Sequence, residues 1–194
     1  WLFLTLSTKN AIDGEHLEQS LKYMSKAFNK LKMYAKVKKN LIGFMRSTEV
    51  TVNKNDGSYN QHMHVLCVEN AYFRKKENYI TQEEWINLWQ KALQVDYKPV
   101  ANIKAIKPNK KGDKDIQAAI KETSKYSVKS SDYLTGNHEK DAEIVQDLEQ
   151  GLYRKRMLSY GGLLKQKHKL LNLDDAEDGN LIQTSDEEKT TEEE

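Results

Sequence analysis

The sequence predicts an α+β fold, with a central antiparallel β-sheet flanked by helices in a ferredoxin-like or RNA-recognition-like arrangement. The first observation behind this prediction is the order of apolar patterns, which alternates between strand and helix periods as β-α-β-β-α-β-α. The second is an Asp56-Gly57 hairpin signal between the two longest strand patterns. The length, 194 residues, suits one well-cored domain followed by a tail.

The first half of the chain contains a strand, a helix and a hairpin. Residues 1–8 alternate as a first strand, and Asp13 can cap the helix that follows. The apolar positions of that helix have helical spacing: Leu17, Leu21, Met24, Phe28 and Leu31. Residues 41–52 and 59–68 read as the two strands of the hairpin, joined by a two-residue turn.

The second half begins with a helix and ends with shorter helical pieces. Thr81 and Glu84 form a capping box, and the buried stripe of the helix they open is Trp85, Leu88, Trp89 and Ala92. Residues 100–106 alternate as another strand that ends before Pro108. A third helix is expected at about 113–129, and shorter helical pieces at 138–170 break at Gly161-Gly162.

Two histidines on one hairpin strand form a candidate metal site. Side chains alternate along a strand, so His62 and His64 point to the same face. With a two-residue turn, Glu49 lies opposite His64 on that face. Two imidazoles and one carboxylate suit a divalent metal with positions left for a substrate oxygen. The alternative is two ordinary histidines on a half-buried strand.

Charge is distributed unevenly along the chain. Residues 174–194 contain ten acidic residues and one lysine, and they are expected to be a disordered tail. Residues 1–173 form the predicted domain, with 30 basic and 19 acidic residues and a net charge of +11. Such a domain can bind a polyanion, and lysines 107, 110, 111 and 114 are candidates for contact with a DNA backbone. Solvated, lysine-rich helix faces are the alternative.

The cysteine content and apolar pattern limit the class of protein. The single cysteine, Cys67, excludes an intrachain disulfide within this sequence, and it alternates onto the same face as Met63 and Val65, where a core thiol is expected. No apolar run approaches membrane-spanning length, and no signal peptide is visible, so we expect a cytoplasmic protein without a membrane partner. The start inside an apolar strand suggests a piece of a longer protein.

The expected third helix contains a candidate nucleophile. Glu122, Tyr126 and Lys129 are spaced by four and three residues, so they share one stripe of the helix. The apolar stripe at positions 116, 120 and 123 lies on a different face. A tyrosine between an acid and a lysine can act as a nucleophile, with the carboxylate moving protons. An exposed tyrosine among charged neighbours is the simpler alternative.

Three ordered segments resemble the motifs of HUH endonucleases: residues 3–6 (FLTL), 59–66 (YNQHMHVL) and 122–134 (ETSKYSVKSSDYL). More narrowly, the chain resembles rolling-circle replication initiators of small Gram-positive plasmids. This resemblance implies a metal-dependent DNA endonuclease and strand transferase. His62 and His64, with Glu49, would hold Mn²⁺ or Mg²⁺, and Tyr126 would attack origin DNA, leaving a 5′-phosphotyrosine and a free 3′-hydroxyl.

The resemblance also implies roles for two further residues and a set of partners. Glu122 would activate water for hydrolysis at termination, and Lys129 would contact a phosphate. The substrate would be single-stranded or hairpin origin DNA, with a host helicase and polymerase as partners and the oligomeric state left open. A mobilisation relaxase or single-strand transposase shares this chemistry. A non-catalytic nucleic-acid-binding module would instead present stacked aromatics on the exposed sheet face.

Overall fold

The strands form a single antiparallel sheet. The computed structural model describes residues 1–70, 73, 77–106, 117, 120, 123 and 136–171. Within these residues the strands follow the order β4-β1-β3-β2-β5, and every neighbouring pair is antiparallel. Their bounds are β1 Leu2–Ser7, β2 Leu41–Val52, β3 Tyr59–Glu69, β4 Ala101–Ala105 and β5 Leu158–Gly161.

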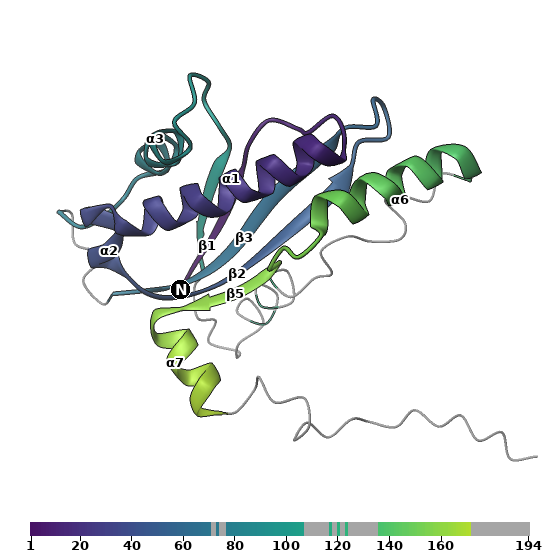
Figure 1. The fold of residues 1–194 in the computed structure, drawn as a ribbon. Helices are drawn as coiled ribbons and strands as arrows, with labels where there is room; N and C mark the ends of the chain where they lie inside the picture. Colours follow the sequence, from purple (N-terminus) through teal and green to yellow (C-terminus); the bar gives the residue numbers. More distant parts are fainter. Residues whose placement is uncertain are drawn as a thin grey trace, which may run out of the picture.

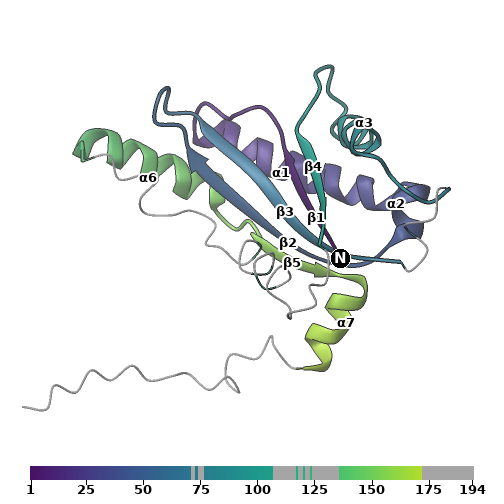
Figure 2. The same cartoon turned by 180° about the vertical axis from the view of Figure 1, so that it is seen from behind.

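Helices cover one face of this sheet. They are α1 Gly14–Met33, α2 Ala35–Asn40, α3 Gln82–Leu93 and α6 His138–Leu152. Helix α7, Gly162–Leu170, lies apart from them and contacts β2 and β5. Helix α1 runs across the sheet with α3 and α6 beside it (Figure 1), and from behind the strands lie in front of α1 (Figure 2). The α+β fold is therefore confirmed, with the predicted β-α-β-β-α-β order in its first four strands. No helix among the described residues is both long and apolar enough to cross a membrane.

The core lies between α1, α3 and the sheet. Asp13 caps α1 by accepting a hydrogen bond from the His16 backbone N–H at 2.8 Å, and all five predicted stripe positions of α1 are buried. The predicted Thr81 capping box opens α3, which buries Trp85 and Trp89 completely. Cys67 is a core thiol as predicted, and burial raises its pKa to about 12.

The hairpin register differs from the prediction. Glu49 pairs with His62 rather than His64, because the strands are joined by a longer loop than a two-residue turn. Asn53 N–H donates to the Ser58 carbonyl at 2.8 Å, and the Asp56 carboxylate accepts from the Ser58 N–H at 2.9 Å. This hydrogen bond between the Asp56 side chain and the Ser58 backbone stabilises the longer loop. The partner of Glu49 on β3 shifts by two residues, so the Glu49 side chain still points to the predicted face of the sheet.

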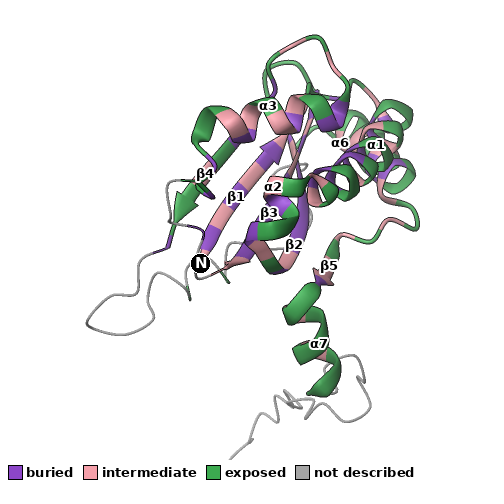
Figure 3. Ribbon diagram, turned by 90° about the vertical axis from the view of Figure 1, so that its left-hand side faces the viewer, coloured by how far each residue is buried: buried purple, intermediate pink, exposed green. Residues whose placement is uncertain are grey.

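One strand was missed in the sequence. Residues 158–161 were expected within a helical stretch, but they form β5 along the outer edge of β2. A Cβ on Gly161 would lie 2.0 Å from the Phe44 ring, so only glycine allows this approach. Gly162 has φ +55 and turns the chain directly into α7, which buries none of its residues (Figure 3).

Several predictions fall largely outside the described residues. Of the expected third helix, the structure describes Gln117, Ile120 and Thr123, each in a helical conformation. Thr123 is buried as predicted, whereas Ile120 is 42 % exposed, so the predicted apolar stripe is wrong at that position. The lysines at 107, 110, 111 and 114 and the acidic tail at 174–194 lie outside the described part of the chain.

Candidate metal centre

The three predicted ligands lie on neighbouring strands near the middle of the sheet. Glu49 comes from β2, and His62 and His64 come from β3. Met63, the residue between the histidines, packs in the core beneath α1, so alternation places both imidazoles on the opposite face of the sheet. The structure therefore brings the predicted ligands together on the face that α1 does not cover.

The ligand atoms are close enough to share one cation. Glu49 Oε2 lies 3.0 Å from Nε2 of His62 and 3.0 Å from Nε2 of His64. One donor atom from each residue falls within 4.8 Å of the others. The side chains of Glu49 and His64 are each 8 % exposed, and that of His62 is 16 % exposed. This donor set of two nitrogens and one oxygen fits a divalent transition metal.

The carboxylate of Glu49 is held in its charged form. Burial by itself raises the pKa of the Glu49 carboxyl, since a charge is poorly solvated there. Hydrogen bonds from the imidazole N–H groups of His64 and His62, together with favourable electrostatic interactions with both rings, outweigh burial and place this pKa below its usual range. Glu49 is therefore ready to act as an anionic ligand.

Two side chains of β1 orient His64. Thr5 lies opposite His64 in the sheet, and its Oγ1 is 3.5 Å from Nδ1, the ring nitrogen remote from Glu49. The Phe3 ring stacks on the imidazole with centroids 5.6 Å apart and planes inclined by 20°. Such contacts restrict the ring orientation of a ligating histidine. Both residues belong to the FLTL segment at residues 3–6, and their contacts with His64 follow from the pairing of β1 with β3.

The remaining predicted site residues, Glu122, Tyr126 and Lys129, lie outside the described residues. Their roles therefore stay predictions.

Comparison with known proteins gives one consistent result. A family model described as "Replication protein" matches residues 1–194. A "Replication protein" of Staphylococcus aureus is 55 % identical over 99 % of this chain and 82 % of its own length. A "Protein rep" of Lactiplantibacillus plantarum is 53 % identical over 99 % of this chain and 61 % of its own length. No solved structure gives a match.

The sheet and its cluster of two histidines and a glutamate define a protein with a candidate metal site on the sheet face opposite α1. The chain belongs to the replication protein family, as both the family model and the relatives establish. This membership agrees with the resemblance noted in the sequence and supports a role as a plasmid replication initiator.

Proposed function

We propose that this protein nicks single-stranded origin DNA by metal-dependent tyrosine transesterification to start rolling-circle replication. The observation that carries the proposal is the convergence of Glu49, His62 and His64 on one sheet face, in a chain of the replication protein family. The relatives' names, "Replication protein" and "Protein rep", favour an initiator over a mobilisation relaxase or a transposase.

The proposed reaction exchanges one phosphodiester for another. The Tyr126 oxygen forms a bond to phosphorus, and the bond from phosphorus to the 3′-oxygen breaks. The phenol proton passes to a base or solvent, and the released 3′-oxygen takes up a proton to become the hydroxyl that a polymerase extends. The 5′-phosphotyrosine keeps the phosphodiester energy available for rejoining.

The chain's own residues would hold the cation and keep it oriented. Glu49 supplies an anionic oxygen, and His62 and His64 supply neutral imidazole nitrogens from the next strand. Thr5 and Phe3 limit the rotation of the His64 ring. A bound Mn²⁺ or Mg²⁺ would polarise the scissile phosphate, which compensates for the weak nucleophilicity of a neutral tyrosine at pH 7.

Glu122 is proposed to end the reaction rather than begin it. Its carboxylate would take a proton from water attacking the phosphotyrosine, breaking the bond between phosphorus and the tyrosine oxygen. Lys129 would contact a phosphate of the bound strand. Host helicase and polymerase would act on the free 3′-end once the nick has been made.

The Glu122→Ala variant tests this division of roles. We expect it to cleave the first strand but to release DNA poorly, so that the covalent adduct accumulates in a time course on denaturing gels. Glu122→Tyr should instead permit a second transesterification and repeated strand transfer. If Glu122→Ala abolishes the first cleavage, Glu122 acts on the nucleophile or the metal, and the termination role is wrong.

A further inference from the structure

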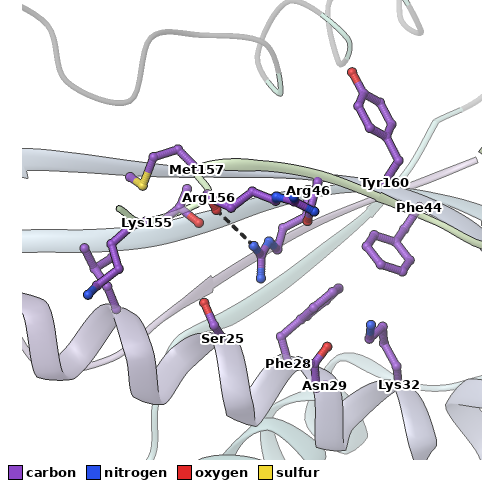
Figure 4. Close-up of a pocket in the computed structure, with 13 residues that line it drawn as sticks. Ser25, Phe28, Asn29, Lys32, Phe44, Arg46, Lys155, Arg156, Met157 and Tyr160 are labelled. Atoms are coloured by element: carbon purple, nitrogen blue, oxygen red, sulfur yellow. Dashed lines mark hydrogen bonds between the residues drawn. The ribbon is translucent and has the colours of Figure 1, made fainter. Parts of the chain in front are cut away.

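A cavity of about 330 Å³ lies on the other side of the sheet from the metal centre. It is enclosed by α1, β2 and the segment that leads from α6 into β5 (Figure 4). Arg46 contributes to it from β2, and Arg46 and Glu49 are three residues apart on one strand, so their side chains point to opposite faces. The cavity is therefore separate from the candidate metal centre.

The described residues that line this cavity include four cations and no acidic side chain. The cations are Lys32, Arg46, Lys155 and Arg156. Lys155 is paired with Glu18 at 2.7 Å, but no ion pair joins Lys32 or Arg46 to a carboxylate among the described residues. Hydroxyl and amide groups of Ser25, Asn29, Thr48 and Ser159 complete the polar lining. The cavity thus has positive charge and hydrogen-bonding groups.

Arg46 is the most unusual member of this group. It is only 7 % exposed, and its Nε is buried without a hydrogen-bond partner. The guanidinium donates one long hydrogen bond, from Nη2 to the Arg156 carbonyl at 3.3 Å. Most buried polar groups are hydrogen-bonded, and an unpaired buried charge is destabilising. A guanidinium in this condition indicates that an acceptor from outside the described residues completes the site.

Contacts with aromatic rings stabilise only part of the positive charge of Lys32 and Arg46. The Lys32 ammonium lies 4.8 Å from the centre of the Phe44 ring and 5.3 Å from that of Phe28, and the Arg46 guanidinium lies 5.6 Å from Phe28. Burial lowers the pKa of Lys32, and the charge of Arg46 lowers it further. The two cations repel each other, and an anion between them would relieve that repulsion.

We propose that this cavity binds a phosphate group through Lys32 and Arg46. A guanidinium can form paired hydrogen bonds to phosphate oxygens, and an ammonium adds a point charge beside them. The phosphate can belong to free phosphate, to a nucleotide or to the backbone of a DNA strand passing behind the sheet. The site does not depend on the metal centre or on the nicking reaction.

Calorimetric titration in EDTA tests the proposal without interference from metal-bound phosphate. The probes are inorganic phosphate, thymidine monophosphate and a short oligothymidylate, each added to wild type, Lys32→Met, Arg46→Met and Lys38→Met. Lys38 is an exposed lysine of α2 that does not line the cavity, so Lys38→Met is the matched control. We expect both cavity variants to weaken binding about tenfold or more and the control to bind like wild type.

The three probes distinguish the sources of the phosphate. Binding of phosphate or of the mononucleotide that depends on Lys32 and Arg46 indicates a free ligand. Binding of the oligonucleotide alone, with the same dependence, indicates a DNA backbone. If no probe binds, or if the cavity variants bind as tightly as Lys38→Met, the proposal is wrong.

Thermal unfolding separates a ligand site from a structural one. Arg46→Met removes an unpaired buried charge but keeps a long apolar stem, so without phosphate it should melt at the wild-type temperature or above it. Phosphate should raise the melting temperature of wild type and leave that of Arg46→Met unchanged. A large loss of stability without phosphate, or failure of Arg46→Met to fold, would show that Arg46 also has a structural role. The half-exposed Lys32→Met then decides the result. If phosphate raises the melting temperature of Lys32→Met as much as that of wild type, the proposal is wrong.

Discussion

At the scale of single residues, the geometry around Glu49 determines what the sheet face can bind. Its Oε2 contacts both imidazoles at 3.0 Å, and all three side chains are largely buried. A cation entering the cluster would replace the hydrogen bonds now made between carboxylate and imidazole. Metal binding at this site is therefore a competition with protons for the histidine nitrogens.

The first prediction concerns the pH dependence of metal binding. Histidine ligates a metal as the neutral imidazole, and histidine side chains ordinarily take up a proton near pH 6.5, so affinity for Mn²⁺ should fall below about pH 6.5. The pKa of Glu49 is lowered, so its carboxylate remains ionised as the imidazoles protonate. Calorimetric titration of Mn²⁺ across this pH range measures the effect. Unchanged Mn²⁺ affinity in a variant carrying His62→Ala and His64→Ala would place the metal elsewhere.

The second prediction concerns the proposed nucleophile. Tyr126→Phe removes one hydroxyl, so we expect it to abolish nicking of single-stranded origin DNA while leaving DNA affinity within about twofold of wild type. Cleavage assays and fluorescence anisotropy measure the two effects. Tyr133→Phe is the control, since Tyr133 is the next tyrosine along the chain. Nicking that survives Tyr126→Phe but not Tyr133→Phe would move the nucleophile to Tyr133.

The sequence predicted which face of the sheet carries the candidate ligands, but it did not predict which residue of β3 lies opposite Glu49. Strand alternation alone placed His62 and His64 on one face, and Glu49 also points there in the structure. The exact partner of Glu49 depended on loop hydrogen bonds made by Asp56, which a turn preference does not reveal. The contacts of Thr5 with His64 required knowledge of which strand lies beside β3.

At the scale of elements, α1 and α6 approach closely because glycines lie at their contact. A Cβ on Gly151 would lie 2.5 Å from Leu17 Cδ2, and one on Gly14 would lie 2.8 Å from the Asp147 backbone. The Tyr59 hydroxyl on β3 donates to the Asp147 carboxylate at 2.7 Å, and this bond ties α6 to the sheet. Helix α6 is therefore held by shape complementarity and by a partly buried hydrogen bond to β3.

The third prediction follows from this close packing. Gly151→Val places a branched side chain against the fully buried Leu17, so it should lower the free energy of unfolding by about 1–3 kcal/mol. Chemical denaturation measures the change. Glu149→Ala, at an exposed position of the same helix, is the control and should alter stability by less than about 0.5 kcal/mol. Equal stability of Gly151→Val and wild type would contradict the packing of α6 on α1.

Strand β5, which the sequence patterns did not predict, depends on tertiary contacts. The capped helices α1 and α3 carry their own start signals and apolar stripes, and both were predicted. Strand β5 has only four residues, and it forms because Gly161 can approach Phe44 on β2. Such a strand has no periodicity of its own to detect, so its assignment required the position of its neighbour.

At the scale of the whole molecule, charge and fold together favour a nucleic-acid ligand. Residues 1–173 carry a net charge of +11, and the candidate metal site and the cationic cavity lie on opposite faces of one sheet. Electrostatic contact with DNA would then involve a wide part of the surface, while chemistry would be confined to the face with the histidines. Binding and cleavage should therefore be separable by mutation.

The fourth prediction tests that separation. DNA affinity should fall steeply with salt, because each neutralised phosphate releases a counterion. The His62→Ala and His64→Ala double variant should keep the wild-type salt slope in EDTA, since neither residue adds a permanent positive charge. Anisotropy titrations at several salt concentrations measure both slopes. A much shallower slope in the double variant would mean that the metal site and the DNA-binding surface are not separate.

In the proposed reaction, a tyrosine of this chain becomes covalently attached to origin DNA with the help of the Glu49, His62 and His64 cluster. Mass spectrometry of the protein after incubation with single-stranded origin DNA and Mn²⁺ detects such an attachment. We expect a nucleotide adduct on Tyr126 that is lost in EDTA and in the Glu49→Ala variant. Cleaved DNA without any adduct, or an adduct that forms equally well in Glu49→Ala, would contradict it.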